Sequence, residues 1–192
     1  MKFQLLVTAI VLLYLSATSY AELTHDNAAQ QAIEEQAMVW LAQTRDNTEA
    51  ITPFTTDGCS GGLSAGWQLL ANSSQTFKNR YGEHPPWEAC CVAHDRTYWR
   101  GETERGYHLR QQADAKLRAC VIEEGKKQAP ELAPVFETTP AEIEKKFNQA
   151  AELMYISVRL GGGPCSGLPW RWGYGWPQCG FSADTSPAQT QN

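Results

Sequence analysis

Residues 90–98 read Cys-Cys-Val-Ala-His-Asp-Arg-Thr-Tyr, a dense cluster of chemically reactive side chains. On an α-helix, Cys91 and Asp95 share one line along the axis, whereas Cys90 and His94 share another line about 100° away. Two adjacent cysteines in a helix are poorly placed to bond each other, so we expect them to bond different partners. The segment can therefore be fixed by disulfides while His94 and Asp95 face a common cavity.

The cysteines and the N-terminus both indicate an exported protein. The six cysteines lie at positions 59, 90, 91, 120, 165 and 179. An even number is typical of a disulfide framework formed in an oxidising compartment. Residues 1–21 combine a charged Lys2, an apolar run and a small-residue ending at Ala21, which predicts a signal peptide cleaved after Ala21. We therefore predict a secreted or periplasmic protein with no transmembrane segment in the mature chain.

The formal net charge of −5 limits the classes of partner. Nucleic-acid binding needs a basic patch, which this balance argues against. A net negative chain also has no general attraction to anionic membranes. We expect a monomer that does not bind nucleic acid.

Helical spacing of apolar residues recurs at about 26–44, 107–124 and 140–159. Gly125 is expected to cap the second of these helices. The third begins with a capping box at Thr139-Pro140-Ala141-Glu142. Together with the helix at 90–98, these segments predict an all-α protein. Residues 182–192 are polar and are predicted to form a disordered tail.

Two segments rich in glycine lie outside the helices. Residues 55–62 read Thr-Thr-Asp-Gly-Cys-Ser-Gly-Gly and predict a tight loop. Because Cys59 ties this loop to another element, a binding loop is favoured over an ordinary surface turn. Residues 165–179 place four aromatic side chains between two cysteines. These aromatics either pack on the domain as one face of a hairpin, which we favour, or form a platform at a lipid surface.

A histidine and two aspartates carry the candidate chemistry. Asp114 lies in an apolar stretch of the second long helix, where a buried carboxylate needs a partner. We therefore expect His94 to act as a base, Asp114 to orient it, and Asp95 to join oxygens of the 55–62 loop in a site for a hard cation.

These residues resemble the secreted phospholipases A2. The pattern CCxxHDxxY at 90–98 is similar to their active-site helix, and the loop at 57–62 is similar to their calcium loop. Asp114, six residues before Cys120, resembles their second helix. The similarity covers about residues 55–121, so the first helix, the third long helix and the 165–179 loop lie outside it.

The chain departs from the family pattern in two ways, and the second of them resembles one branch of the family. The family has cysteines at the positions of Thr97 and Ala113, and both are missing here, which looks like the loss of one whole disulfide. His94 and Asp114 are only 20 residues apart. This short connection resembles the compact bacterial and fungal enzymes.

The resemblance implies a fold of two antiparallel, disulfide-linked catalytic helices with a calcium loop, within a domain at 22–181. It implies the pairings Cys59–Cys91 and Cys90–Cys120, which leaves Cys165 with Cys179 to close the tryptophan-rich loop.

The resemblance also implies calcium-dependent hydrolysis of the sn-2 ester of glycerophospholipids, presented as aggregates or a membrane surface. His94 would activate water, Asp114 would orient His94, and Tyr98 would bond Asp114. Calcium would be bound by Asp95 and by loop oxygens. The loop ligands would be either the carbonyls of Gly58, Ser60 and Gly62 or the Asp57 carboxylate with the Gly58 carbonyl; both sets stay open.

Three other interpretations compete with this one. The chain could be a catalytically weak or inactive phospholipase-fold protein, such as a lipid-binding or toxin-like module. It could be a zinc protein that uses cysteine and histidine ligands. The same constellation could also hydrolyse another acyl ester, such as a lipopeptide.

Overall fold

The computed structural model describes residues 28–59 and 63–179, which are helical and contain no strand. The prediction of an all-α chain is therefore confirmed for these residues. The predicted signal peptide at 1–21 and tail at 182–192 lie outside them, as do Ser60 and Gly62. The chain divides into two units, Met1–Gln36 and Ala37–Asn192.

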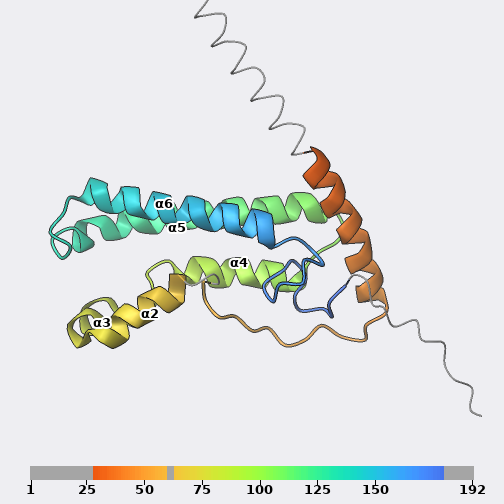
Figure 1. Cartoon of the computed structure of the whole chain (residues 1–192), viewed down its shortest axis with the longest axis horizontal. Coiled ribbons are helices and arrows are strands. Elements are labelled where there is room, and N and C mark those ends of the chain that lie inside the picture. The colour runs from red at the N-terminus through yellow and green to blue at the C-terminus, as the bar shows by residue number, and fades with distance from the viewer. Residues whose placement is uncertain (1–27, 60–62, 180–192) are drawn as a thin grey trace, which may run out of the picture. The chain divides into compact units, whose positions relative to one another are not determined.

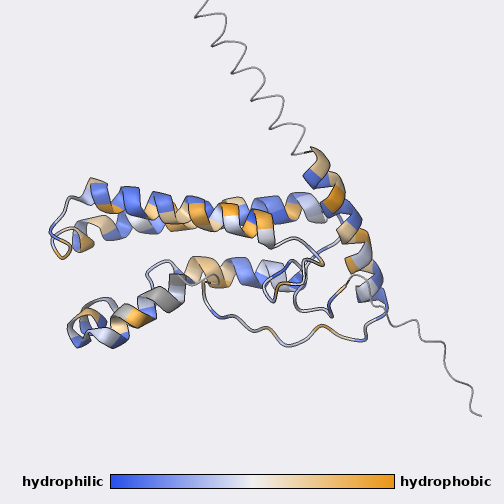
Figure 2. Cartoon of the chain, in the orientation of Figure 1, coloured by the Kyte–Doolittle hydropathy of each residue, from blue (hydrophilic) through white to orange (hydrophobic). Residues whose placement is uncertain are grey.

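Six helices lie within the described residues (Figure 1). They are an N-terminal helix at 28–46, α2 (Leu63–Ser73), α3 (Gln75–Tyr81), α4 (Glu88–Arg100), α5 (Gly106–Leu132) and α6 (Pro140–Gly161). Helices α5 and α6 pack side by side in opposite directions, and α4 packs against α5. Hydrophobic and hydrophilic residues alternate along α6, as expected for an amphipathic helix (Figure 2).

Three disulfides hold the elements around α4 and close the last loop. Cys59–Cys91 ties the glycine-containing loop to α4, and Cys90–Cys120 ties α4 to α5. Cys165–Cys179 closes the loop that follows α6. The expected pairings are confirmed. Each bond removes freedom from the unfolded chain, which stabilises the fold by about 3 kcal/mol in the chain-entropy account.

Helix α5 corrects the predicted helix end at Gly125. The helix continues to Leu132 with Pro130 inside it. Gly125 is buried, and a Cβ added there would overlap the Phe147 side chain of α6. The glycine therefore allows α5 and α6 to approach closely instead of ending α5.

The tryptophan-rich loop at 165–179 packs on the C-terminal end of α4 without forming a hairpin. The amide N–H groups of Gly173 and Gly175 donate to the carbonyls of Tyr98 and Trp99, at 2.6 and 3.1 Å. These bonds to α4 take the place of a strand ladder, so the predicted hairpin is wrong. Trp172 is fully buried, which agrees with the favoured packing interpretation.

No helix in the described part of the chain is both long enough and apolar enough to cross a membrane.

Replacing Gly101 with alanine should strongly destabilise the fold. Gly101 ends α4 at φ +56°, and a Cβ there would overlap the backbone of Gly173. Left-handed strain costs about 1–2 kcal/mol before the overlap is counted, so we expect a loss of about 3 kcal/mol and a Tm lower by about 10 °C. Gly163→Ala is the control, because a Cβ there meets nothing within 4 Å. Equal melting temperatures for the two variants would contradict this packing.

Candidate active site

Asp114 is the centre of the candidate site, and it is completely buried. Its Oδ1 accepts hydrogen bonds from Nε2 of His94 at 2.8 Å and from the Tyr98 hydroxyl at 2.6 Å. Both partners lie on one side of α4, as the i, i+4 spacing predicts, and Cys90–Cys120 holds α4 against the helix that carries Asp114. The expected contacts of Asp114 with His94 and Tyr98 are both present.

Two arginines, which the sequence interpretation missed, bind the other side of Asp114. Nη1 of Arg159, near the end of α6, lies 2.8 Å from Oδ2, and Nη1 of the fully buried Arg110 lies 3.6 Å from it. Arg110 also donates to the Tyr98 hydroxyl at 3.0 Å and to the Val158 carbonyl at 2.9 Å. Helix α6 is therefore part of the site.

These contacts keep the Asp114 carboxylate ionised. Burial alone would raise its pKa, but the hydrogen bonds from His94, Tyr98 and Arg159 and the charge of Arg110 lower the pKa below its ordinary value of 3.8. Burial and the neighbouring carboxylate raise the pKa of Tyr98 well above its ordinary value, so Tyr98 stays a phenol that donates its hydrogen.

The ionised carboxylate fixes the tautomer of His94. Asp114 can only accept, so Nε2 of His94 must carry the hydrogen that joins them. The other ring nitrogen, Nδ1, then has a lone pair when the ring is neutral. Nδ1 lies 3.8 Å from Oδ1 of Asp95. Burial disfavours the charged ring, but the hydrogen bonds and charges of Asp114 and Asp95 outweigh it and raise the pKa of His94 above 6.5.

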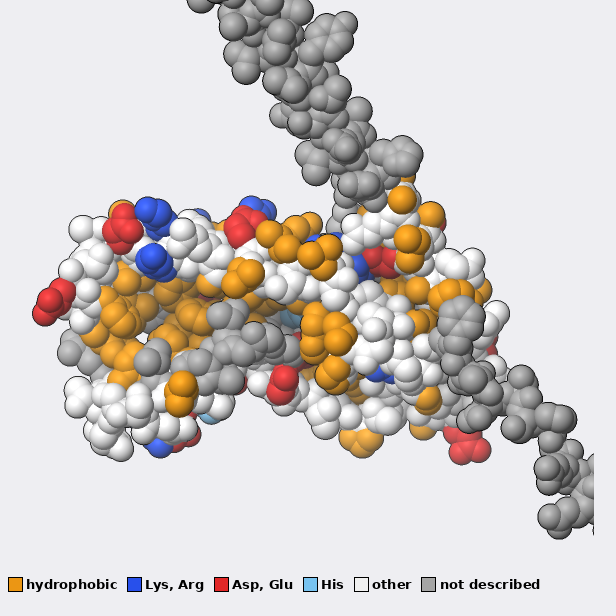
Figure 3. Space-filling view, viewed as in Figure 1, with side chains coloured by type: hydrophobic (Ala, Val, Ile, Leu, Met, Phe, Trp, Pro, Cys, Tyr) orange, Lys and Arg blue, Asp and Glu red, His pale blue; other side chains and the backbone are white. Residues whose placement is uncertain are grey.

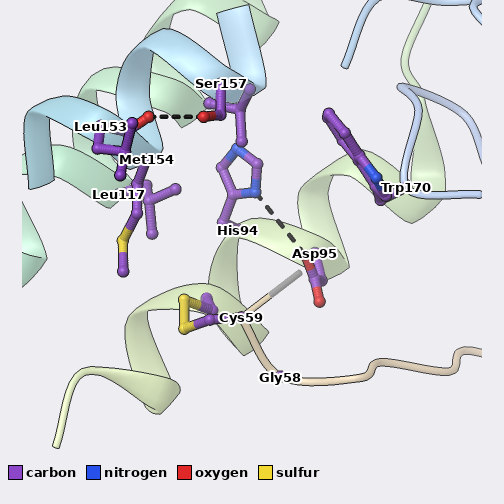
Figure 4. A pocket seen from close by; sticks show the side chains of 11 residues that line it. Gly58, Cys59, His94, Asp95, Leu117, Leu153, Met154, Ser157 and Trp170 are labelled. Carbon is purple, nitrogen blue, oxygen red and sulfur yellow. Dashed lines mark hydrogen bonds and ion pairs between the residues drawn. A yellow bond between two sulfur atoms is a disulfide. The ribbon is translucent and has the colours of Figure 1, made fainter. Parts of the chain in front are cut away.

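His94 opens into a cavity of about 240 Å³ between α4, α5 and α6. Figure 4 shows the imidazole pointing into this space, with Leu153 and Met154 on one side and Asp95 and Trp170 on the other. Apolar side chains form most of the wall, and the backbone at Gly58 and the Cys59–Cys91 disulfide complete it. The expectation that His94 and Asp95 share a cavity is confirmed.

Oxygen atoms gather on the other side of Asp95. A second cavity of about 280 Å³ shares Asp95 and Trp170 with the first, and Thr56 and Asp57 also line it. The Thr56 hydroxyl donates to Oδ2 of Asp95 at 2.6 Å. The pKa of the Tyr174 hydroxyl is raised mainly by burial and next by the charges of Asp95 and Asp57. Both carboxylates therefore lie near that ring.

The oxygen ligands near Asp95 are of the kind that calcium prefers. Hard cations prefer carboxylate, carbonyl and hydroxyl oxygens, and Asp95 is nearly buried beside a hydroxyl and a titratable imidazole. In the part of the chain described, no group of three or more histidine, cysteine, aspartate or glutamate residues could hold a metal. A cation here would therefore need backbone oxygens of the loop as well as carboxylates.

The predicted calcium ligands are only partly brought together. Asp95 and Gly58 line the cavity of His94, and Asp57 and Asp95 line the neighbouring one. Gly58 adopts φ +78°, the left-handed conformation expected for a tight loop. Ser60 and Gly62 lie outside the described residues, so the two ligand sets are not separated.

Comparisons with protein-family models, with curated proteins and with solved structures find no match for this chain.

Proposed function

We propose that this protein is a calcium-dependent phospholipase A2 that is exported and hydrolyses the sn-2 ester of glycerophospholipids. One observation carries the proposal. His94 donates from Nε2 to a buried, ionised Asp114, while its Nδ1 faces an apolar cavity next to Asp95. A base held in this way in a cavity suited to an acyl chain favours ester hydrolysis by an activated water.

The reaction follows from these groups. Neutral His94 takes a proton from water at Nδ1 as the water oxygen bonds the ester carbonyl carbon. Asp114 holds the ring and stabilises the imidazolium that forms. The bond between the carbonyl carbon and the alcohol oxygen then breaks, and the imidazolium returns its proton to that oxygen. The products are a fatty acid and a lysophospholipid.

Asp95 would hold calcium together with oxygens of the loop, of which the Asp57 carboxylate and the Gly58 carbonyl are candidates. Calcium held there would supply Lewis-acid polarisation of the ester carbonyl and would offset the negative charge that develops on its oxygen.

Two alternatives are less well supported. A zinc site built on thiolates needs free cysteines, but all six cysteines are in disulfides and none is free. Among the described residues that line the cavity, the serine is Ser157, and its hydroxyl donates to the Leu153 carbonyl at 2.8 Å, which does not favour a nucleophile. An inactive lipid-binding module remains the main competitor, and hydrolysis of another acyl ester is a variant of the proposal.

Product analysis tests the proposal. Phospholipid vesicles whose sn-1 and sn-2 chains differ are incubated with the mature protein, with calcium or with EDTA. We expect release of the sn-2 fatty acid in calcium and a loss of about a thousandfold in EDTA. Release of the sn-1 chain, or full activity in EDTA, would contradict the proposal. Vesicle binding without release would favour the inactive module.

The activity should fall on the acid side as pH drops through the pKa of His94, and calcium bound at Asp95 should move that midpoint downward. His94 acts as a base only when neutral. Burial lowers its pKa, and the hydrogen bonds and charges of Asp114 and Asp95 outweigh burial when no cation is bound; calcium at Asp95 would offset the charge of that carboxylate. As pH falls through that pKa, Nδ1 takes a proton and the base is lost. The measurement is kcat/KM against pH at saturating calcium. A rate that stays flat down to about pH 4 would mean that a group other than His94 acts as the base.

A further inference from the structure

The outer surface beside the cavity is formed by the second half of α6 and the loop after it. The exposed side chains there are Leu153, Ile156 and Leu160, at 56, 52 and 75% exposure, followed by Leu168 at 36%. Leu153, Ile156 and Leu160 are spaced by three and four residues and so share one side of the helix. We call these four side chains, with Trp170, the α6 face. Figure 3 shows hydrophobic side chains gathered over the end of α6 and the loop that follows.

The α6 face is continuous with the cavity of His94. Leu153 is exposed outside and also lines the cavity. Trp170 lines the cavity from the loop, and both Trp170 and Leu168 pack on Gly161, where an added Cβ would meet their side chains. Apolar side chains of α6 and of the following loop therefore lead from solvent into the cavity that the imidazole faces, and Asp95 lies on the other side of that cavity.

The second half of α6 differs sharply in charge from the first half. Residues 140–152 contain five charged side chains, but residues 153–170 contain only Arg159. The Arg159 side chain is 13% exposed and pairs inward with Asp114. The next charged residue, Arg171, is buried, and its guanidinium donates to the Trp176 carbonyl. On the α6 side of the cavity, the exposed side chains from Leu153 to Trp170 are thus uncharged apart from the inward-pointing Arg159.

We infer that the α6 face inserts into the surface of zwitterionic lipid, held by apolar burial and not by attraction to anionic headgroups. The inference rests on the proposed function, because the lipid surface is where the substrate would be found. Exposed leucines on the outer side of a helix suit insertion into a fluid layer. A tryptophan at the edge suits the boundary between lipid and water. The negative net charge of the chain offers no long-range attraction to anionic lipid.

Vesicle binding in EDTA, where no calcium-dependent hydrolysis occurs, tests the inference. The probes are phosphatidylcholine vesicles with and without phosphatidylglycerol, at low and high salt. We expect the wild type to bind phosphatidylcholine vesicles, with a change of less than about twofold on adding anionic lipid or salt. Leu160→Asp should weaken binding by about tenfold or more, because a leucine that insertion would bury in lipid is replaced by a charge. Leu69→Asp on α2 is the matched control, since Leu69 is 71% exposed, and it should bind as the wild type does.

Three outcomes would overturn the inference. In the first, the wild type binds only vesicles that contain anionic lipid, and salt abolishes the binding. In the second, the Leu160 and Leu69 variants bind equally well. In the third, the wild type does not bind vesicles but self-associates, and Leu160→Asp abolishes the self-association. Hydrolysis of a short-chain monomeric phospholipid separates this test from the proposed function. Leu160→Asp should keep that activity and lose vesicle hydrolysis. If the wild type binds vesicles but hydrolyses neither substrate, the proposed function is contradicted, whereas the inference that the α6 face binds lipid is supported.

Discussion

Replacing His94 with glutamine is expected to lower phospholipid hydrolysis by about a thousandfold while the protein stays folded. The glutamine amide can still donate to Asp114 near the position of Nε2, so the buried carboxylate keeps a partner. The amide has no basic nitrogen in place of Nδ1, so the proton of the attacking water has no acceptor. General-base catalysis typically supplies about 10²–10⁴-fold in rate. The measurement is the initial rate on vesicles at saturating calcium, with Tm measured in parallel.

Ser157→Ala is the matched control for His94. Ser157 lines the same cavity, but its hydroxyl bonds the Leu153 carbonyl. We expect its rate to stay within about threefold of the wild type. Activity of His94→Gln within about tenfold of the wild type would remove His94 from the mechanism. A loss in Ser157→Ala as large as that in His94→Gln would instead indicate a serine nucleophile.

The parts of the site that the sequence predicted depend on local spacing and covalent bonds. Cys90, His94 and Tyr98 recur at helical spacing, so a single helix is enough to align them. The Cys90–Cys120 disulfide then brings in α5, and Asp114 lies on that helix, less than two turns before Cys120. Where a short segment and one disulfide determine a position, the pattern of residues is sufficient.

The parts that were missed depend on packing between elements far apart in the sequence. Arg159 lies 45 residues after Asp114 and resembles a basic residue in the last turn of a helix, where it interacts favourably with the helix dipole. The only available signal was the buried carboxylate itself, which needs more than one neutral partner. Gly125 was misread for a similar reason, because a glycine after a helical pattern is typical of a C-cap and its contact with Phe147 is a property of α6.

Changing Asp114 to asparagine should reduce hydrolysis by about a thousandfold although no atom that touches substrate is altered. An asparagine that offers its amide N–H₂ to His94 makes Nε2 an acceptor, which moves the ring hydrogen to Nδ1. The nitrogen that faces the cavity then cannot take a proton. The same substitution in serine proteases costs about 10⁴-fold by selecting the wrong tautomer. The measurement is kcat on vesicles at saturating calcium.

Tyr98→Phe is the matched control for Asp114. It removes one hydrogen bond to the same oxygen but leaves the carboxylate and hence the tautomer of His94. Because the tautomer is kept, we expect a loss of rate well below that of Asp114→Asn, although a hydrogen bond to a charged group contributes about 1.5–3 kcal/mol to stability. Comparable losses in the two variants would mean that rigidity, and not the tautomer, is what Asp114 provides.

Stability must be measured with the Asp114 variant, because its neighbours are charged. Asparagine leaves Arg110 and Arg159 without the anion that they share. An uncompensated buried charge costs about 3–5 kcal/mol, so we expect Asp114→Asn to melt well below Tyr98→Phe. Rates are therefore compared at a temperature at which both variants are folded. If Asp114→Asn is as stable as the wild type, the two arginines do not depend on Asp114, and α6 is held to the site by other contacts.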